Sequence, residues 1–215
     1  MIELVLKLGV SYLLGSILGS LVLGRARGVD IRRLGSGNAG STNALRTQGK
    51  VFALGVMLID VGKGWLATQI VPQLPLPLAP ALSVIHNWLP AACGAAAMLG
   101  HVYPLWFGLR GGKAVATLLG AILGLAPRLL FPVALAWIAG AVLTGFVSVA
   151  SIAAAAMLPV AVVAAGLAWR TPLLGFGLFS ALLVLFTHRA NLRRLRAGCE
   201  PRAQRLWWFG RRAPS

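Results

Sequence analysis

The chain has 215 residues, of which 58% are hydrophobic and only 11% are charged, and its mean hydropathy is +0.83. A soluble globular domain carries roughly 25% charged residues, so this composition excludes that class and predicts an integral membrane protein. Twenty Lys and Arg residues outweigh four Asp and Glu, and the net charge of +16 favours an anionic lipid or anionic substrate as partner. Nucleic acid is not expected, because basic and aromatic residues do not alternate on a polar domain.

Seven apolar segments have the length, or nearly the length, of a membrane helix of about 20 residues. We expect an all-α polytopic membrane protein with helices at residues 3–24, 51–71, 82–105, 113–126, 129–147, 149–168 and 171–188. They form one membrane domain over residues 1–200, followed by a basic and aromatic tail at 201–215. Residues 72–80 contain four prolines, which predicts a connecting loop there.

Between the first two predicted helices lies a run of glycines, hydroxyls and amides, GSGNAGSTNALR, at residues 35–46. Backbone N–H groups that converge before a helix N-terminus make a site for an anion, so this loop predicts phosphate binding. The residues expected to bind are Gly35, Ser36, Gly37, Asn38, Thr42 and Asn43, with Arg46 supplying a planar charge. A tight capping loop is the alternative without a ligand. The literal GxGxxG match does not predict a dinucleotide site, because no βαβ unit surrounds it.

Asp60 and Lys63 lie inside the second predicted helix, three residues apart and therefore on one face. Paired charges cost less to bury in a membrane than single ones. We favour a structural ion pair over a proton or ion relay, since no other carboxylate in the membrane continues a relay.

Three further groups of polar residues follow the apolar segments. The loop GHVYPLWFGLRGGKAVAT holds Gly111, Gly112, Lys113 and Thr117; Ser148 and Ser151 separate two helices; HRANLRRLRAGCE holds His188, Asn191 and Glu200. Interfacial anchoring is the alternative for Lys113, helix packing for the serines, and capping or an interfacial position for His101 and His188. The tail residues Trp207, Trp208 and Phe209 are expected to lie at the membrane interface.

The basic residues predict the orientation. Seven spans place most of them on one side, in loops 25–50 and 106–113 and in the tail after residue 188; only Lys7, Arg128 and Arg170 fall on the other. By the positive-inside rule, the N-terminus is outside, the C-terminus is cytoplasmic, and the polar groups meet at the cytoplasmic face.

Absent motifs narrow the chemistry. The four acidic residues form no catalytic carboxylate pair, no Ser lies in GxSxG, and no His begins the HxxxxD motif of common acyltransferases. The Cys and His spacings indicate neither a disulfide nor a metal site, and no cofactor is expected. A cationic pocket rich in hydrogen-bond donors remains, which suits two phosphate-bearing substrates.

Three segments closely resemble the signature regions of the bacterial acyl-phosphate-dependent glycerol-3-phosphate acyltransferases: GSILGSLVLGRARGVDIRRLGSGNAGSTNALRTQG, GHVYPLWFGLRGGKAVAT and HRANLRRLRAGCE. The resemblance implies a multi-pass inner-membrane enzyme of phospholipid synthesis with a cytoplasmic active site. It would move an acyl group from acyl phosphate to the 1-hydroxyl of glycerol 3-phosphate, giving lysophosphatidic acid and inorganic phosphate. Two departures are Ala114, where the family has glycine, and Ser41, where alanine is usual.

The resemblance also implies roles for individual residues. The expected catalytic residues are Arg46, Lys113, His188 and Asn191; the expected binding residues are those of the first loop together with Gly111, Gly112, Thr117, Ser148 and Glu200. Either a bound phosphate or His188 would serve as the base for the glycerol hydroxyl. A transporter of a phosphorylated or anionic solute is the alternative function, although transporters place their sites nearer the bilayer midplane. The sequence does not predict the oligomeric state.

Overall fold

The structure, a computed structural model, describes residues 2–75, 83–166, 172–204 and 206–209, and these residues form helices and loops without any strand. The helices are α1 (Ile2–Gly15), α2 (Gly19–Ala26), α3 (Ser41–Gln48), α4 (Lys50–Gln69), α5 (Ser83–Val102), α6 (Val115–Leu125), α7 (Leu130–Thr144), α8 (Val147–Ala164), α9 (Pro172–Thr187) and α10 (Arg189–Arg196). Four single 3₁₀ turns join them: η1 (Ile31–Arg33), η2 (Val71–Gln73), η3 (Leu105–Phe107) and η4 (Pro127–Leu129).

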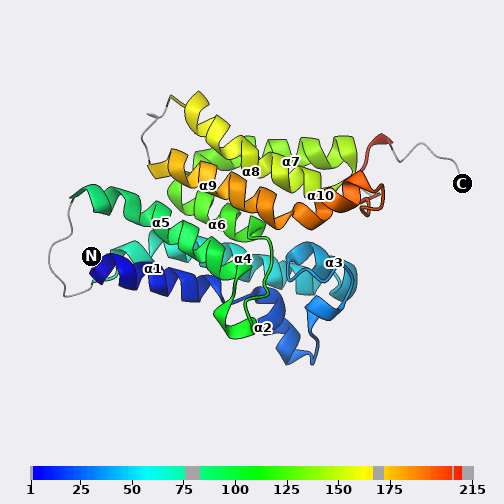
Figure 1. Ribbon diagram of the computed structural model, residues 1–215, viewed down its shortest axis with the longest axis horizontal. Coiled ribbons are helices and arrows are strands. Elements are labelled where there is room, and N and C mark those ends of the chain that lie inside the picture. The colour runs from blue at the N-terminus through cyan, green and yellow to red at the C-terminus, as the bar shows by residue number, and fades with distance from the viewer. Residues whose placement is uncertain (1, 76–82, 167–171, 205, 210–215) are drawn as a thin grey trace, which may run out of the picture. The chain divides into compact units, whose positions relative to one another are not determined.

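Residues 1–127 make one compact unit. Within it, α4 packs against α6 and α5, and α1 packs along α5 (Figure 1). Glycines permit the closest approach: a Cβ atom on Gly64 of α4 would lie 2.1 Å from the Thr117 carbonyl oxygen of α6. Small residues at helix contacts are the usual means by which membrane helices approach one another.

Residues 128–215 make a second compact unit. Figure 1 shows α7, α8 and α9 side by side in it, each packed against the next. The chain then turns by 53° from α9 into the short basic helix α10.

The predicted single helix at 3–24 is wrong as a continuous helix, because it breaks after Gly15 and resumes at Gly19 with a bend of 48°. The other six predicted helices are present in the described residues, within a few residues of the predicted bounds. Residues 82, 167, 168 and 171 of these predictions, and residues 76–80 of the predicted loop, lie outside the described residues. Two polar helices, α3 and α10, were not expected, since neither carries the long apolar run used to find spans.

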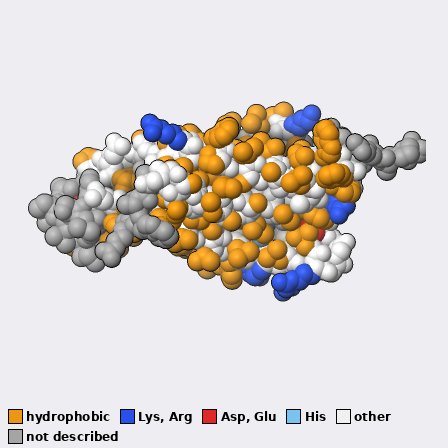
Figure 2. Space-filling model, turned by 90° about the horizontal axis from the view of Figure 1, so that it is seen from above, with side chains coloured by type: hydrophobic (Ala, Val, Ile, Leu, Met, Phe, Trp, Pro, Cys, Tyr) orange, Lys and Arg blue, Asp and Glu red, His pale blue; other side chains and the backbone are white. Residues whose placement is uncertain are grey.

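Large hydrophobic side chains cover much of the surface. Val51 is 81% exposed, Phe131 is 76% exposed and Leu182 is 67% exposed. Figure 2 shows such side chains over most of the described face that it presents. Exposed apolar surface on this scale is stable against lipid rather than water. In the described residues, three helices are long and apolar enough to span a membrane, or up to five if each bent pair is one span. The count of seven and the orientation stay predictions.

Candidate active site

The first glycine-rich loop, residues 31–40, is held by the side chain of Asn43 from α3. The Asn43 Nδ2 group donates to the carbonyl oxygens of Ile31 at 3.1 Å and Leu34 at 2.9 Å, and its Oδ1 accepts from the Ser36 N–H at 3.0 Å. The buried amide thus uses both donors and its acceptor on the loop backbone. Asn43 was expected to bind phosphate. In the structure, the three hydrogen bonds of its side chain go to the loop backbone and hold the loop in shape.

Gly35 and Gly37 are required by this loop for backbone reasons. Both have positive φ, +55° and +72°, a region that other residues enter at a cost. A Cβ atom on Gly35 would also meet Asn43 Oδ1. The turn leaves Ser36 exposed and Asn38 half-buried at the start of α3, where Thr42 follows.

Arg46 lies in the last turn of α3 and is exposed. Within the part of the chain that the structure describes, no hydrogen bond or ion pair fixes its guanidinium group. An arginine in that state is available to an anionic ligand.

The second glycine-rich loop, residues 103–114, joins α5 to α6 and is strained. Among the described residues, Leu109 and Ala114 are the non-glycine residues with positive φ, +57° and +61°, and both belong to this loop. Left-handed backbone at non-glycine residues costs about 1–2 kcal/mol each. Such strain persists where surrounding contacts impose it, often at functional sites. Lys113, expected to be catalytic, stands half-buried directly before Ala114.

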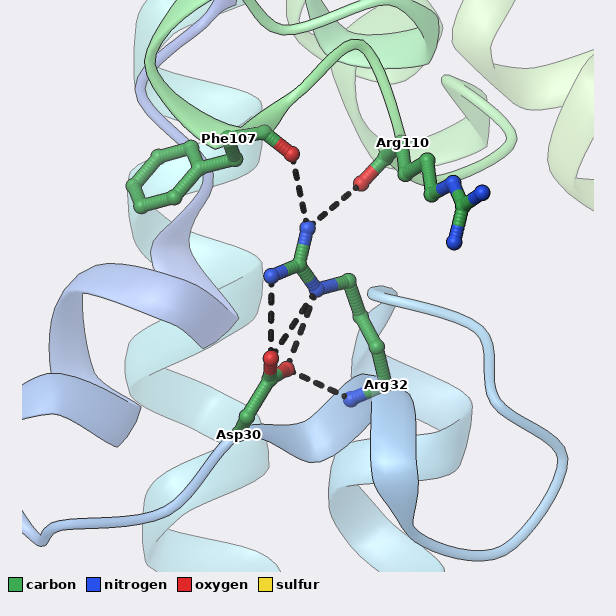
Figure 3. A network of polar contacts seen from close by, with 4 residues as sticks. All are labelled: Asp30, Arg32, Phe107 and Arg110. Atoms are coloured by element: carbon green, nitrogen blue, oxygen red, sulfur yellow. Dashed lines mark hydrogen bonds and ion pairs between the residues drawn. The ribbon is translucent and has the colours of Figure 1, made fainter.

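Arg32 joins the two loops (Figure 3). Its guanidinium group binds both carboxylate oxygens of Asp30, and its Nη1 donates to the carbonyl oxygens of Phe107 at 2.8 Å and Arg110 at 3.2 Å. The Phe107 side chain packs on the apolar cluster of α2, α3 and α4 that lies beneath the first loop. Sequence reasoning missed Arg32, although its spacing from Asp30 could have suggested an ion pair.

The hydrogen bonds between Asp30 and Arg32 shift the pKa of both groups. They hold the pKa of the Asp30 carboxyl below its ordinary 3.8 and raise the pKa of Arg32. Burial opposes both shifts but is outweighed. The pair is therefore ionised at neutral pH, and its charge keeps Arg32 oriented toward the second loop.

The predicted Asp60–Lys63 ion pair is confirmed, with Lys63 Nζ 2.9 Å from Asp60 Oδ1 and both side chains buried. Two contacts were not expected. Lys63 donates to the Ile17 carbonyl oxygen and the Gly19 N–H donates to Asp60, so the pair satisfies backbone groups at the break between α1 and α2. His101 of α5 joins the cluster, its Nδ1 2.8 Å from Lys63 Nζ.

In the second unit, the Glu200 carboxylate accepts hydrogen bonds from three side chains, those of Ser148, Asn191 and Arg194. Its Oε1 accepts from the Ser148 hydroxyl at 2.8 Å and from Asn191 Nδ2 at 2.6 Å, and its Oε2 accepts from Arg194 at 2.8 Å. Burial alone would raise the pKa of the Glu200 carboxyl, but these hydrogen bonds lower it below its ordinary 4.5. Ser148 of α8 thus lies beside Asn191 and Glu200, which belong to a separate group of polar residues in the sequence.

His188 is buried at the end of α9, and its Nδ1 lies 2.8 Å from the Val184 carbonyl oxygen. A carbonyl oxygen only accepts hydrogen bonds, so Nδ1 carries the proton and, in the neutral ring, Nε2 carries the lone pair. This tautomer suits a general base.

Thr117 is fully buried where α6 packs against α4, and its Oγ1 has no hydrogen-bond partner in the described residues. Its contact with substrate stays a prediction. No three His, Cys, Asp or Glu residues of the described part are placed to hold a metal ion.

Comparison with known proteins identifies the family. The family model described as "Glycerol-3-phosphate acyltransferase" matches residues 5–198. A glycerol-3-phosphate acyltransferase of Synechococcus sp. (strain CC9902) is 42% identical over 202 residues, 92% of this chain and 94% of the relative. One from Geobacter sulfurreducens is 43% identical over 201 residues, covering 93% of this chain and 97% of the relative.

Solved structures of PlsY (YgiH), an integral membrane glycerol 3-phosphate acyltransferase, share the fold. The glycerol 3-phosphate form and the lysophosphatidic acid form each match with a TM-score of 0.80 at 33% identity. Each match covers 93% of this chain and 94% of the PlsY chain.

Proposed function

Because the chain belongs to the glycerol-3-phosphate acyltransferase family, we propose that it takes its acyl group from acyl phosphate and transfers it to the 1-hydroxyl of glycerol 3-phosphate. The products are lysophosphatidic acid and inorganic phosphate. The observation that carries this proposal is the pair of glycine-rich loops that Arg32 ties together, with Arg46 on helix α3, which follows the first loop, and Lys113 on the second loop. Two phosphate-bearing substrates call for two such loops.

The reaction needs little covalent help from the protein. The glycerol oxygen forms a bond to the acyl carbonyl carbon, and the bond from that carbon to the phosphate oxygen breaks. The hydroxyl proton passes to the leaving phosphate, either directly or by way of His188. Acyl phosphate is already activated, so orientation and charge stabilisation supply most of the rate. Arg46 and Lys113 stabilise charge on the carbonyl oxygen and the leaving phosphate. Ser36, Thr42 and Asn191 position phosphate groups.

A bound phosphate or His188 takes the proton. For the protein alternative, the hydrogen bond from His188 Nδ1 to the Val184 carbonyl oxygen fixes the orientation of the imidazole ring. His101 is a poorer base, since Lys63 already uses its Nδ1 lone pair.

The long acyl chain stays in hydrocarbon, where each buried CH₂ contributes about 0.8 kcal/mol. We therefore place its entry in the membrane, between helices, and the entry of glycerol 3-phosphate on the aqueous side. This places the loops at the cytoplasmic face of the bacterial inner membrane, as the distribution of basic residues favours.

The test is donor-dependent synthesis. Purified protein in detergent, given palmitoyl phosphate and glycerol 3-phosphate, should release one phosphate for each lysophosphatidic acid formed. Palmitoyl-CoA in place of palmitoyl phosphate should give no product. Product from the thioester, or glycerol 3-phosphate uptake into proteoliposomes without any donor, would contradict the proposal and favour another acyltransferase or a transporter.

Arg46→Ala and Lys113→Ala should each lower turnover about 10²-fold or more, because each removes a positive side chain that stabilises negative charge on the reacting groups. Arg205→Ala is the control, since it lies in the tail beyond the family match at residue 198. Equal, mild losses in all three variants would contradict the site assignment.

Thiol labelling tests the orientation. Cys93 is buried and Cys199 is exposed, so a Cys199→Ser background removes the native reactive site. In that background, Ser36→Cys should react with a membrane-impermeant reagent from the cytoplasmic side only, with protection by glycerol 3-phosphate. Arg128→Cys, exposed between α6 and α7, should react from the opposite side. Reversed labelling would overturn the topology.

A further inference from the structure

The buried cluster of Asp60, Lys63 and His101 lies directly against the second glycine-rich loop. The His101 carbonyl oxygen accepts from the Gly112 N–H at 3.0 Å, and the neighbouring Val102 carbonyl oxygen accepts from Gly111 at 3.1 Å. The end of the loop that carries Lys113 is therefore hydrogen-bonded to the last turn of α5.

Lys63 fixes the protonation of the His101 ring. A lysine ammonium has three donors and no acceptor. All three donors have partners, namely Asp60 Oδ1 at 2.9 Å, the Ile17 carbonyl oxygen at 2.9 Å and His101 Nδ1 at 2.8 Å. His101 Nδ1 must therefore accept, so the ring is neutral and its proton is on Nε2.

The fixed ring determines what residue 112 can be. A Cβ atom on Gly112 would lie 2.2 Å from His101 Nε2, far inside van der Waals contact, whereas its backbone φ is not in the positive range. Gly112 is thus glycine because of the imidazole rather than because of its own backbone. Gly111 differs: its Cβ would lie 2.0 Å from the His101 carbonyl oxygen, which is backbone.

The same cluster is also connected to the first loop through the start of helix α2. Asp60 accepts from the Gly19 N–H at the start of α2, and the next residue, Ser20, donates its hydroxyl to the Ala39 carbonyl oxygen in the first loop at 2.7 Å. The buried cluster is therefore bonded to the second loop directly, through His101, and to the first loop indirectly, through Gly19 and Ser20.

We propose that Asp60, Lys63 and His101 act as a positioning device for the reaction, with His101 as the positioning residue on which the Gly111–Gly112–Lys113 segment is seated. The ion pair holds the imidazole with its proton on Nε2, and the Nε2 edge of the imidazole sets the path of the backbone that aims Lys113. The charged pair inside a membrane helix is thereby explained without a relay. This role rests on the proposed function, in which Lys113 stabilises the transferring phosphate.

A double-mutant cycle tests the seat. Gly112→Ala should lower kcat/KM about 10²-fold, because displacement of a catalytic group by about 1 Å costs that much. His101→Asn keeps an acceptor for Lys63 but removes the outer part of the ring, and should cost on the order of 10-fold. In the His101→Asn background, Gly112→Ala should cost little more, since its methyl group enters the vacated space.

Gly111→Ala is the matched control. Its clash is with the His101 backbone, so it should be equally harmful in both backgrounds. The proposal is supported if His101→Asn restores kcat/KM in Gly112→Ala but not in Gly111→Ala, with the thermal stability in detergent unchanged. The proposal would be overturned if the kcat/KM losses of His101→Asn and Gly112→Ala multiply in the double variant, or if His101→Asn restores activity in both glycine variants.

Nitrogen NMR of histidine-labelled protein gives a readout that needs no activity. The His101 signals, assigned by their loss in His101→Asn, should show a protonated Nε2 and an unprotonated Nδ1. The reverse tautomer or a doubly protonated ring would contradict the arrangement. Because this measurement does not depend on turnover, an inactive enzyme with the expected tautomer would refute the proposed function and leave the cluster geometry standing.

Discussion

The two glycine-rich loops of the first unit are held in opposite ways. The first loop is shaped from within its own segment, since Asn43 reaches back only 7 to 12 residues to bind Ser36, Leu34 and Ile31. The second loop is shaped from outside, by Arg32 from 75 and 78 residues away and by the ring of His101, which Lys63 fixes. The first relies on glycines for its positive φ angles, whereas the second also forces Leu109 and Ala114 into that region. A self-contained loop can hold its form alone, but a strained loop keeps its form only through its neighbours.

The largest effect should come from breaking the internal hold of the first loop. Asn43→Ala removes three hydrogen bonds, each worth about 0.5–1.5 kcal/mol, and should lower the free energy of unfolding by about 2–4 kcal/mol. Chemical unfolding in detergent measures this loss. Asn38→Ala is the stability control, because no hydrogen bond of the described residues uses its side chain. An Asn43 loss no larger than the Asn38 loss would mean that the loop holds its form without the amide.

This difference explains what could be read from the sequence. GSGNAGSTNALR revealed a structured polar loop because its glycines and its amide lie within one short segment. The Asp60–Lys63 pair was equally readable, since a spacing of three places two residues on one helix face. The apolar runs after the first likewise predicted six apolar helices to within a few residues of the ends that the described residues show.

The long-range contacts were not readable. The break between α1 and α2 follows from no proline or polar run; Lys63 and Asp60, some 40 residues later, satisfy the freed backbone groups there. The sequence predicts a capping or interfacial position for His101, because no residue near it in the sequence indicates that it contacts Lys63. Such partners depend on how α4 and α5 pack, which a single sequence does not specify.

A second prediction breaks the external hold of the second loop. Arg32→Met removes the two carbonyl bonds and the ion pair with Asp30, and should lower the free energy of unfolding by about 1–2 kcal/mol. The loops lose their common register, so kcat/KM for glycerol 3-phosphate should fall on the order of 10-fold. Arg32→Lys should behave like Arg32→Met, because an ammonium cannot span the carboxylate and both carbonyls. Wild-type activity in Arg32→Lys would show that charge alone matters, and exposed Arg33→Met controls for lost charge.

A third prediction uses pH to weaken the Asp30–Arg32 ion pair, which orients Arg32 toward the second loop. The folded-state pKa of Asp30 is lowered, so the ion pair contributes stability above the ordinary value of 3.8 and loses it as the pH falls through the folded pKa. For a partly exposed pair this contribution is up to about 1 kcal/mol. Unfolding measured from pH 5 down to pH 3 should therefore show a smaller drop in Asp30→Asn than in the wild type. Parallel curves would mean that the Asp30 charge does not hold Arg32.

The smallest effect should come from relieving strain in the second loop. Ala114 is fully buried with φ +61°, in the left-handed region that favours glycine. Ala114→Gly removes about 1–2 kcal/mol of left-handed strain but loses a buried methyl group worth about 0.8 kcal/mol and adds freedom to the unfolded chain worth about 0.4–1 kcal/mol. These terms nearly cancel, so stability should change by no more than about 0.5 kcal/mol. Ala121→Gly is the matched control, because Ala121 is equally buried but lies inside helix α6 with no strain to relieve, and should cost about 1–2 kcal/mol. Equal losses at the two positions, measured by thermal unfolding in detergent, would mean that the second loop is not strained at Ala114 and that its external supports hold a relaxed backbone.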